Sequence, residues 1–221
     1  EEKKTVNLAF LIEAGKRVYV RRINFTGNGN TNDETLRREM RQLEGSLFSR
    51  AAIERSRQRL ARLPFLQDVN IETKPVPGSD DLMDIVFAVS ERPPGSVQLG
   101  VGYQGSSGFL VTGNVTHSNF RGTGERVAVD VAYFSTSKSV NLSHTDPFFN
   151  DSGVSQTLSL SYRNTDSVVR TSSGFDTNAF NVSATYGLPL SEYANARIGL
   201  GVEKLSLRTS GSSSVEVLDF V

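Results

Sequence analysis

Residues 94 to 103 read Pro-Gly-Ser-Val-Gln-Leu-Gly-Val-Gly-Tyr, and the composition of the chain changes at this stretch. Most Arg and Glu residues lie before residue 92, whereas Ser, Thr, Gly, Asn and alternating apolar residues dominate after residue 95. Side chains of an extended strand alternate between two faces. One face of the stretch carries Val97, Leu99, Val101 and Tyr103. The other face carries Gln98, Gly100 and Gly102, and its two interior glycines predict a weak strand.

The alternation repeats toward the C-terminus, which predicts seven strands in this half of the chain. The apolar residues of the six later strands are Val111 and Val115; Val127, Val129, Val131 and Tyr133; Val140 and Leu142; Leu158, Leu160 and Tyr162; Phe180, Val182, Ala184, Tyr186 and Leu188; and Ala196, Ile198, Leu200 and Val202. Leu205 and Leu207 are out of phase with the last set. We therefore expect a bulge there, or a strand end beyond the apolar band.

Alternation alone does not separate a soluble β-sandwich from a membrane β-barrel, because both have one polar and one apolar face. The aromatic residues favour the barrel, since they collect near both ends of the predicted strands, as interfacial girdles require. One end has Phe120, Phe148, Phe149 and Tyr193, and the other has Tyr103, Phe109, Tyr133, Phe134, Tyr162 and Phe175. No run approaches the about 20 apolar residues of a spanning helix, but a spanning strand needs only about 9–11 residues.

A small mixed domain with the order β-α-α-β-β is predicted before residue 92. A strand over residues 17–25 leads to a helix with a Thr31–Glu34 capping box. Its apolar residues are Leu36, Met40 and Leu43, and Gly45 ends it. Ser49 caps a second helix that carries Ala52, Ile53, Leu60 and Leu63 and stops at Pro64. Two strands follow, with Val69 and Ile71 in the first and Met83, Ile85, Phe87 and Val89 in the second.

Composition limits the possible functions. Lys plus Arg and Asp plus Glu both number 24, so net charge gives no bias toward nucleic acid. Arginines cluster between residues 37 and 62, but acidic residues are interleaved with them and no aromatic platform accompanies them, so we expect no nucleic-acid partner. The chain has no Cys, which excludes a disulfide and a thiolate zinc site.

No motif in the sequence predicts catalysis, a cofactor or a metal. Residues 100–105 match G-x-G-x-x-G, but another strand follows where a dinucleotide site needs a helix. His117 and His144 lie near strand ends beside hydroxyl residues, without a G-x-S-x-G elbow. Metal ligation by these histidines with Asp130 or Asp146 has no supporting motif. We expect a protein that is not an enzyme and that uses no cofactor and no metal.

Three separated blocks resemble the last POTRA domain of the BamA family of outer-membrane protein assembly factors. They are Arg22-Ile-Asn-Phe-Thr-Gly-Asn28, Leu36-Arg-Arg-Glu-Met-Arg-Gln-Leu-Glu-Gly45 and Arg59-Leu-Ala-Arg-Leu-Pro-Phe65. In the second half, Asn119-Phe-Arg-Gly-Thr-Gly-Glu125 and Thr145-Asp-Pro-Phe-Phe149 are similar to turn motifs of that family's barrel. The resemblance spans nearly the whole chain.

The resemblance implies an α+β POTRA domain (β-α-α-β-β) followed by an all-β, antiparallel transmembrane β-barrel segment of about seven strands. The expected parts are residues 1–15, a remnant strand of a preceding POTRA domain; 16–92, a POTRA domain; 93–95, a linker; and 96–221, the first strands of the barrel. Seven strands are too few to close such a barrel, so we expect an incomplete one. The implied location is the outer membrane of a Gram-negative bacterium, with the POTRA domain in the periplasm.

The function implied by the resemblance is assembly and insertion of β-barrel proteins into the outer membrane. Client strands would join exposed strand edges by β-augmentation. One edge is the first barrel strand: Val97, Gln98, Leu99, Gly100, Val101, Gly102 and Tyr103. The other is a POTRA strand: Asp68, Val69, Asn70, Ile71, Glu72, Thr73 and Lys74. The implied partners are unfolded outer-membrane proteins, outer-membrane lipid and accessory lipoproteins such as BamD, which would meet Arg41 and Glu44 through an exposed ion pair.

Two other functions fit the same pattern. A translocator of the two-partner secretion or TamA type also joins POTRA domains to a barrel. A soluble adhesion or binding module could combine a small α+β domain with a β-sandwich. The charges at Arg41 and Glu44 also fit an ordinary solvated helix surface.

Overall fold

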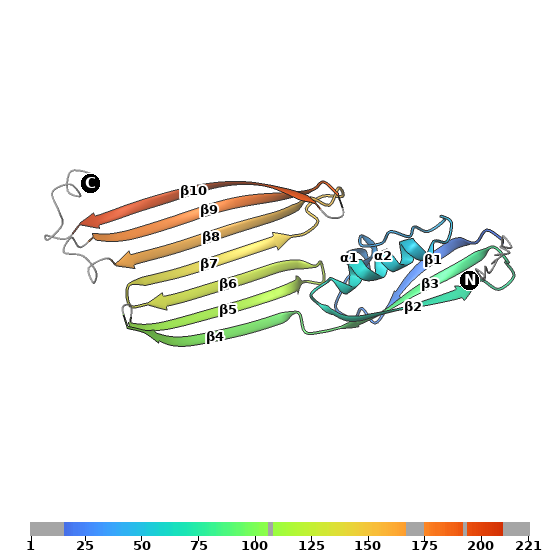
Figure 1. The fold of residues 1–221 in the computed structure, drawn as a ribbon, viewed down its shortest axis with the longest axis horizontal. Coiled ribbons are helices and arrows are strands. Elements are labelled where there is room, and N and C mark those ends of the chain that lie inside the picture. The colour runs from blue at the N-terminus through green and yellow to red at the C-terminus, as the bar shows by residue number, and fades with distance from the viewer. Residues whose placement is uncertain (1–15, 106–107, 167–174, 192–193, 210–221) are drawn as a thin grey trace, which may run out of the picture.

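The computed structural model describes residues 16–105, 108–166, 175–191 and 194–209, which form two sheets arranged end to end (Figure 1). One sheet has three strands in the order β1-β3-β2. The other has seven strands in the order β10-β9-β8-β7-β6-β5-β4. The predicted remnant strand at residues 1–15 lies outside the described residues.

The first unit has the predicted order β-α-α-β-β. Its elements are β1 (Tyr19–Thr26), α1 (Asp33–Arg37), α2 (Arg50–Ala61), β2 (Leu66–Pro75) and β3 (Leu82–Glu91). β1 runs parallel to β3, and β2 runs antiparallel to it. One apolar cluster fills the space between helices and sheet: Val20, Ile23, Leu36, Met40, Ile53, Leu60, Phe65, Leu66, Val69, Ile85, Phe87 and Val89. The alternating and i, i+4 apolar positions therefore predicted most of this core.

The first helix is much shorter than predicted. It ends at Arg37, and its N-cap is Asn32 without a side-chain cap hydrogen bond, so the predicted capping box is wrong. The hydroxyl of Ser56 on α2 accepts the backbone N–H groups of Arg41 (2.8 Å) and Gln42 (3.3 Å). A continued helix would need those N–H groups for its own carbonyls. Leu43 is consequently 65% exposed instead of lying on a buried stripe.

The second helix begins and ends as predicted. The hydroxyl of Ser49 accepts the backbone N–H of Ala52 at 3.3 Å, which confirms Ser49 as the N-cap. The helix ends at Ala61, before Pro64. Ala52, Ile53 and Leu60 are buried, and Leu63 packs against the core while staying partly exposed.

The seven-stranded sheet is a simple antiparallel meander. Its strands are β4 (Gly95–Gln104), β5 (Gly108–Phe120), β6 (Glu125–Phe134), β7 (Ser137–Asp146), β8 (Ser155–Asp166), β9 (Phe175–Pro189) and β10 (Asn195–Thr209). As far as the structure describes the chain, the sheet is open, with β4 at one edge and β10 at the other. The predicted fold class is therefore confirmed. The predicted bulge at Leu205 and Leu207 is wrong, because β10 pairs with β9 without a register shift.

Strand register places whole rows of like side chains across the sheet. An apolar row crosses all seven strands through Val97, Val115, Val129, Leu142, Leu160, Val182 and Val202. The next row, on the other face, reads Gln98, Asn114, Asp130, Asn141, Ser161, Asn181 and Glu203. We call these the apolar face and the polar face of the sheet.

The apolar face has no second sheet packed on it in the described part of the chain. Its side chains stay exposed even in central strands, for example Val131 at 45% and Val140 at 47%. A β-sandwich would bury this face against another sheet, so the sandwich alternative is wrong for the described residues. None of the described helices is long and apolar enough to cross a membrane.

Gly27 ends β1 at a position that only glycine fits. Its φ is +86°, and an added Cβ would lie 2.0 Å from the carbonyl oxygen of Val89. We predict that Gly27→Ala destabilises the first unit by about 2 kcal/mol or more, because both the backbone and the contact become strained. Hydrogen exchange of the β1 and β3 amides measures this loss.

Gly78→Ala is the matched control, because Gly78 also has a positive φ (+82°) but nothing lies within 4 Å of its added Cβ. It should cost about 1 kcal/mol from backbone strain alone. Equal effects of the two substitutions would contradict the steric part of the prediction.

Candidate functional site: two open strand edges and the contact between the sheets

The predicted pairing edge of the barrel lies on β4, an outermost strand of its sheet. Its only neighbour among the described residues is β5, so the other side of its backbone is unpaired there. The side chains of the apolar face are accordingly more exposed here than in central strands, with Leu99 at 83% and Val101 at 86%. Such an edge is a template for another strand.

Two glycines, Gly100 and Gly102, leave part of the polar face of β4 without side chains. A Cβ on Gly100 would lie 2.6 Å from the hydroxyl of Thr112 on β5, and one on Gly102 would lie 3.3 Å from Leu110. Neither residue adds a side chain to the packing of β4 against β5. A strand with two interior glycines is more weakly held than one with β-branched residues.

The three-stranded sheet also has one open edge. β2 is an outermost strand, and its charged and polar side chains at residues 68, 70, 72 and 74 are exposed. The predicted POTRA edge strand lies within β2 and pairs with β3 alone in the described part of the chain. The structure therefore places both predicted pairing strands at sheet edges, whereas their pairing with a client stays a prediction.

The opposite edge of this sheet, β1, is covered. The segment of residues 45–48 runs beside it, with hydrogen bonds from Val20 N–H to Ser46 O (3.0 Å), Gly45 N–H to Val20 O (2.7 Å) and Phe48 N–H to Val18 O (2.8 Å). This cover leaves β2 as the accessible edge of the described sheet.

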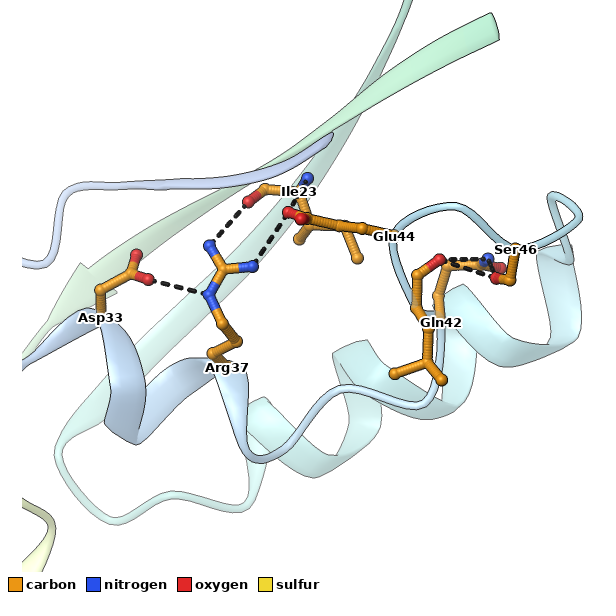
Figure 2. A network of polar contacts seen from close by, with 7 residues as sticks. Ile23, Asp33, Arg37, Gln42, Glu44 and Ser46 are labelled. Carbon is orange, nitrogen blue, oxygen red and sulfur yellow. Dashed lines mark hydrogen bonds and ion pairs between the residues drawn. The ribbon is translucent and has the colours of Figure 1, made fainter. Parts of the chain in front are cut away.

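Side chains complete the cover of β1, as Figure 2 shows. The Glu44 carboxylate accepts the Ile23 backbone N–H (2.8 Å), and Arg37 donates to the Ile23 carbonyl (3.0 Å). Arg37 also forms ion pairs with Glu44 and Asp33, each at 3.0 Å. The buried amide of Gln42 holds the following loop through Ser46 at 2.7 Å. Arg37 and Glu44 thus satisfy backbone groups that an open edge would expose.

The predicted lipoprotein contact residues, Arg41 and Glu44, lie in the loop after α1 and not on a helix. Glu44 forms its ion pair with Arg37, and both contacts of its carboxylate use Oε1. Arg41 lines a cleft of about 550 Å³ between the POTRA unit and the turns of the large sheet, together with Arg38, Arg59 and Arg197. Sequence reasoning missed Arg37, because its spacing resembles that of neighbouring exposed arginines.

The β5–β6 turn of the large sheet docks on α1 of the POTRA unit. The Gly122 carbonyl accepts both the backbone N–H of Asn32 (3.0 Å) and the hydroxyl of Thr35 (2.8 Å). The buried Asn119 amide donates to the hydroxyl of Thr31 at 2.9 Å and accepts the Gly124 N–H at 2.8 Å. A Cβ on Gly122 would lie 2.5 Å from the Asn30 carbonyl oxygen. The glycines of this turn therefore permit close backbone contact between the two units.

Arg38 connects the POTRA unit to two turns at once. Its Nη2 donates to the Thr123 carbonyl in the β5–β6 turn at 2.8 Å, and its guanidinium lies over the Phe148 ring of the β7–β8 turn, 4.3 Å from the ring centroid. Burial lowers the pKa of Arg38, and Glu39 and Asp146 act in the opposite direction. An arginine remains charged under such a shift. The two turn motifs noted in the sequence are thus contact points, which strand periodicity could not predict.

The two histidines lie in one row on the apolar face, opposite the predicted partner Asp130 on the polar face. The other predicted partner, Asp146, follows His144 by two residues on the same face of β7. His144 Nε2 is 2.8 Å from Glu125 Oε2, and the ring of His117 packs edge-on against Phe120. Asp130 on the polar face contacts the amides of Asn114 and Asn141 instead. No group of three or more His, Asp or Glu side chains in the described residues is arranged to hold a metal ion.

Two families match this chain. The POTRA family, described as surface antigen variable number repeat, matches residues 18–92, and the Omp85 superfamily domain matches residues 119–219. The outer membrane protein assembly factor BamA of Neisseria meningitidis serogroup B is 30% identical over 222 residues, which is 100% of this chain and 28% of that protein. BamA of Buchnera aphidicola is 28% identical over 207 residues, 90% of this chain and 32% of that protein. The chain thus spans about a third of the length of these relatives.

Solved structures show the same architecture. BamA from Haemophilus ducreyi lacking POTRA domains 1–3 superposes with a TM-score of 0.78 at 37% identity, covering 89% of this chain and 37% of that chain. CdiB from Acinetobacter baumannii has a TM-score of 0.62 at 12% identity, covering 91% of this chain and 40% of that chain. The second likeness concerns the fold alone.

The Glu44 carboxylate gives the POTRA unit a pH-dependent contact. Its hydrogen bond from the Ile23 N–H, assisted by Arg37, lowers the pKa of Glu44. A lowered folded pKa contributes stability that is complete above the unfolded value of about 4.3 and is lost as the pH falls through the folded value. We predict that Glu44→Gln costs about 1 kcal/mol at pH 7, after allowance for solvent screening of this half-exposed group, and much less near pH 3.5.

Hydrogen exchange of the Ile23 amide, with urea unfolding at both pH values, measures the effect. Glu72→Gln is the control, because the exposed Glu72–Lys74 pair at 3.0 Å should contribute little at either pH. The prediction fails if Glu44→Gln has the same cost at both pH values.

Proposed function

We propose that the whole protein assembles β-barrel proteins and inserts them into the outer membrane, because the chain matches the POTRA and Omp85 superfamily models and is similar to BamA. The seven-stranded sheet would form part of the wall of a barrel in that membrane, with the POTRA unit in the periplasm. Clients would be unfolded outer-membrane β-proteins. The work proposed is binding and insertion, without covalent chemistry and without a cofactor.

The physical difficulty of insertion is the strand backbone. Each unpaired N–H or C=O group in hydrocarbon costs several kcal/mol, so a client strand cannot enter the bilayer alone. An edge strand of a protein already in the membrane can pair with it by β-augmentation. The observation that carries this proposal is the open, glycine-thinned edge of β4 in the large sheet.

We propose that β2 of the POTRA unit receives the client before β4 does. It is an open edge in a soluble environment, where pairing with an extended segment needs no membrane entry. Its exposed side chains include Asp68, Asn70, Glu72 and Lys74, which would keep the edge soluble when no client is bound. Because the β1 edge is covered, a client segment would pair with this sheet at β2.

The fold alone also fits a translocator of the two-partner secretion or TamA type, since CdiB shares it. Sequence identity supports assembly instead, because BamA relatives reach 30–37% identity whereas the CdiB structures reach 12–16%. No contact in the described residues favours a translocator.

We also propose that Glu44 and Arg41 contact an accessory lipoprotein of the assembly complex, such as BamD. The Glu44 side chain is 44% exposed, and both contacts that its carboxylate makes within the described part of the chain use Oε1. An arginine or lysine of the partner could pair there without breaking the cover of β1.

Equilibrium binding of the purified lipoprotein to the full-length protein tests this contact. We predict that Glu44→Gln weakens binding about fivefold or more, as expected for loss of an interfacial charge pair. Asp33→Asn is the matched control, because it removes the other carboxylate beside Arg37 and leaves the Glu44 charge in place. Equal loss in both variants would mean that the network supports only the fold.

Cross-linking tests the pairing of clients with β4. In the full-length protein without other cysteines, Val101→Cys should form a disulfide with a cysteine in the terminal strand of a client while assembly proceeds. Val101 is suitable because its side chain is exposed, whereas a side chain at Gly100 would meet Thr112. Cysteines at several successive client positions should reveal one preferred register.

Val131→Cys is the matched control for this experiment. Val131 lies on the same apolar face, but its strand β6 is paired on both sides. Cross-links at β4 and not at β6 are expected. If no client register cross-links to Val101→Cys during active assembly, client pairing at this edge is refuted.

A further inference from the structure

The two open edges belong to different sheets that are joined by a very short connection. β3 ends at Glu91 and β4 begins at Gly95, and the residues between them are Arg92, Pro93 and Pro94. In Figure 1, β2 and β4 lie along the same side of the molecule. A connection of three residues fixes the distance between the sheets, but it does not by itself fix their rotation about the connection.

The docked β5–β6 turn and Arg38 provide the contacts that restrain this rotation. The hydrogen bonds of Gly122 and Asn119 hold α1 to one turn. Arg38 adds a second point, since Phe148 belongs to the β7–β8 turn. Two attachments on different turns resist rotation in a way that one attachment cannot.

The residue next to Phe148 faces a different partner. Phe149 is 52% exposed, and its ring packs against Tyr186 of β9 at 5.9 Å between centroids. Tyr186 belongs to the apolar face and pairs with Gln156 at the start of β8, beside the β7–β8 turn. The aromatic pair lies at the position of an interfacial girdle. The β7–β8 turn thus contacts the POTRA unit through one phenylalanine and the expected membrane surface through the next.

The geometry points to Arg38 as a positioning residue, which holds the β2 edge at one fixed orientation to the β4 edge so that a client strand passes from the first to the second. This inference rests on the proposed function in barrel assembly. In this role Arg38 acts through its contacts with Thr123 and Phe148 and not through contact with a client. It acts through the orientation of the POTRA unit.

Arginine suits this role better than lysine does. A planar guanidinium can lie over an aromatic ring and donate from its rim to a carbonyl at the same time. A lysine ammonium is a compact, strongly hydrated charge that cannot reproduce both contacts in one geometry. We therefore expect Arg38→Lys to fall between the wild type and Arg38→Met.

Two measurements on the full-length protein, in its complex and in lipid bilayers, test the inference. Spin labels at Lys74→Cys on β2 and Ser152→Cys in the β7–β8 turn report the orientation of the POTRA unit as a distance distribution. Arg38→Met should broaden that distribution and slow client assembly about fivefold, the scale of a lost cation–π contact and a lost hydrogen bond. Hydrogen exchange of the POTRA core checks that the variant is folded.

Arg55→Met is the matched control, because Arg55 is an exposed arginine on α2, a helix that contributes nothing to this pair of turn contacts. It should leave both measurements unchanged. A rescue variant combines Arg38→Cys with Phe148→Cys, joined by a short bis-maleimide. The cross-linked form should regain a narrow distribution, measured through a second labelling chemistry, and a rate near that of the wild type.

Several results would overturn the inference. An unchanged distance distribution in Arg38→Met would show that Arg38 does not set the orientation. A broadened distribution with an unchanged assembly rate would show that orientation does not limit assembly. A rescue that narrows the distribution without restoring the rate would assign Arg38 another role. If the wild type does not accelerate client assembly over lipid alone, the proposed function fails. If the wild type accelerates assembly and Arg38→Met does so at the same rate, the inference about Arg38 fails and the proposed function stands.

Discussion

The structure depends on one constraint, that the backbone N–H and C=O groups of every strand need hydrogen-bond partners. Among the described residues, five of the seven strands in the large sheet have neighbours on both sides, and the unpaired groups collect at β4 and β10. In apolar surroundings such groups cost several kcal/mol each, so the open edge is also the most reactive part of the sheet toward another strand. The glycines of β4 add a second property, because they leave this edge with little packing on its polar face.

The POTRA unit meets the same constraint in two ways. At β1, backbone from residues 45–48 and the side chains of Arg37 and Glu44 occupy the edge. At β2, exposed charged side chains keep an open edge soluble, a common protection of edge strands. The shortened first helix is part of this solution. Because Ser56 takes the N–H groups that would continue α1, the chain is free to run back along β1.

The contact between the units is small, polar and specific. The Gly122 carbonyl accepts two hydrogen bonds. The Arg38 guanidinium makes one hydrogen bond and one cation–π contact. Polar contacts of this kind have stricter geometry than apolar packing, so they favour one orientation over its neighbours. Phe148 and Phe149 extend the contact from the POTRA unit to the aromatic rim of the sheet.

Local pattern in the sequence determined the two units, the seven strands, the Ser49 cap and most of the POTRA core, because alternation and helical spacing follow directly from backbone geometry. It did not predict Val20, Phe65 and Leu66 as core residues. It did not determine where the first helix ends, since the hydroxyl that stops it, Ser56, comes from a later helix. For Leu205 and Leu207 it left open a bulge or a strand end beyond the apolar band, and regular pairing with β9 excludes the bulge. The sequence gives no reason to distinguish three neighbouring arginines, Arg37, Arg38 and Arg41. In the structure the first covers a strand edge, the second joins two sheets and the third lines a cleft. Only the tertiary structure decided these roles, because each depends on which carbonyl, carboxylate or ring, distant along the chain, comes within a few ångströms of the side chain.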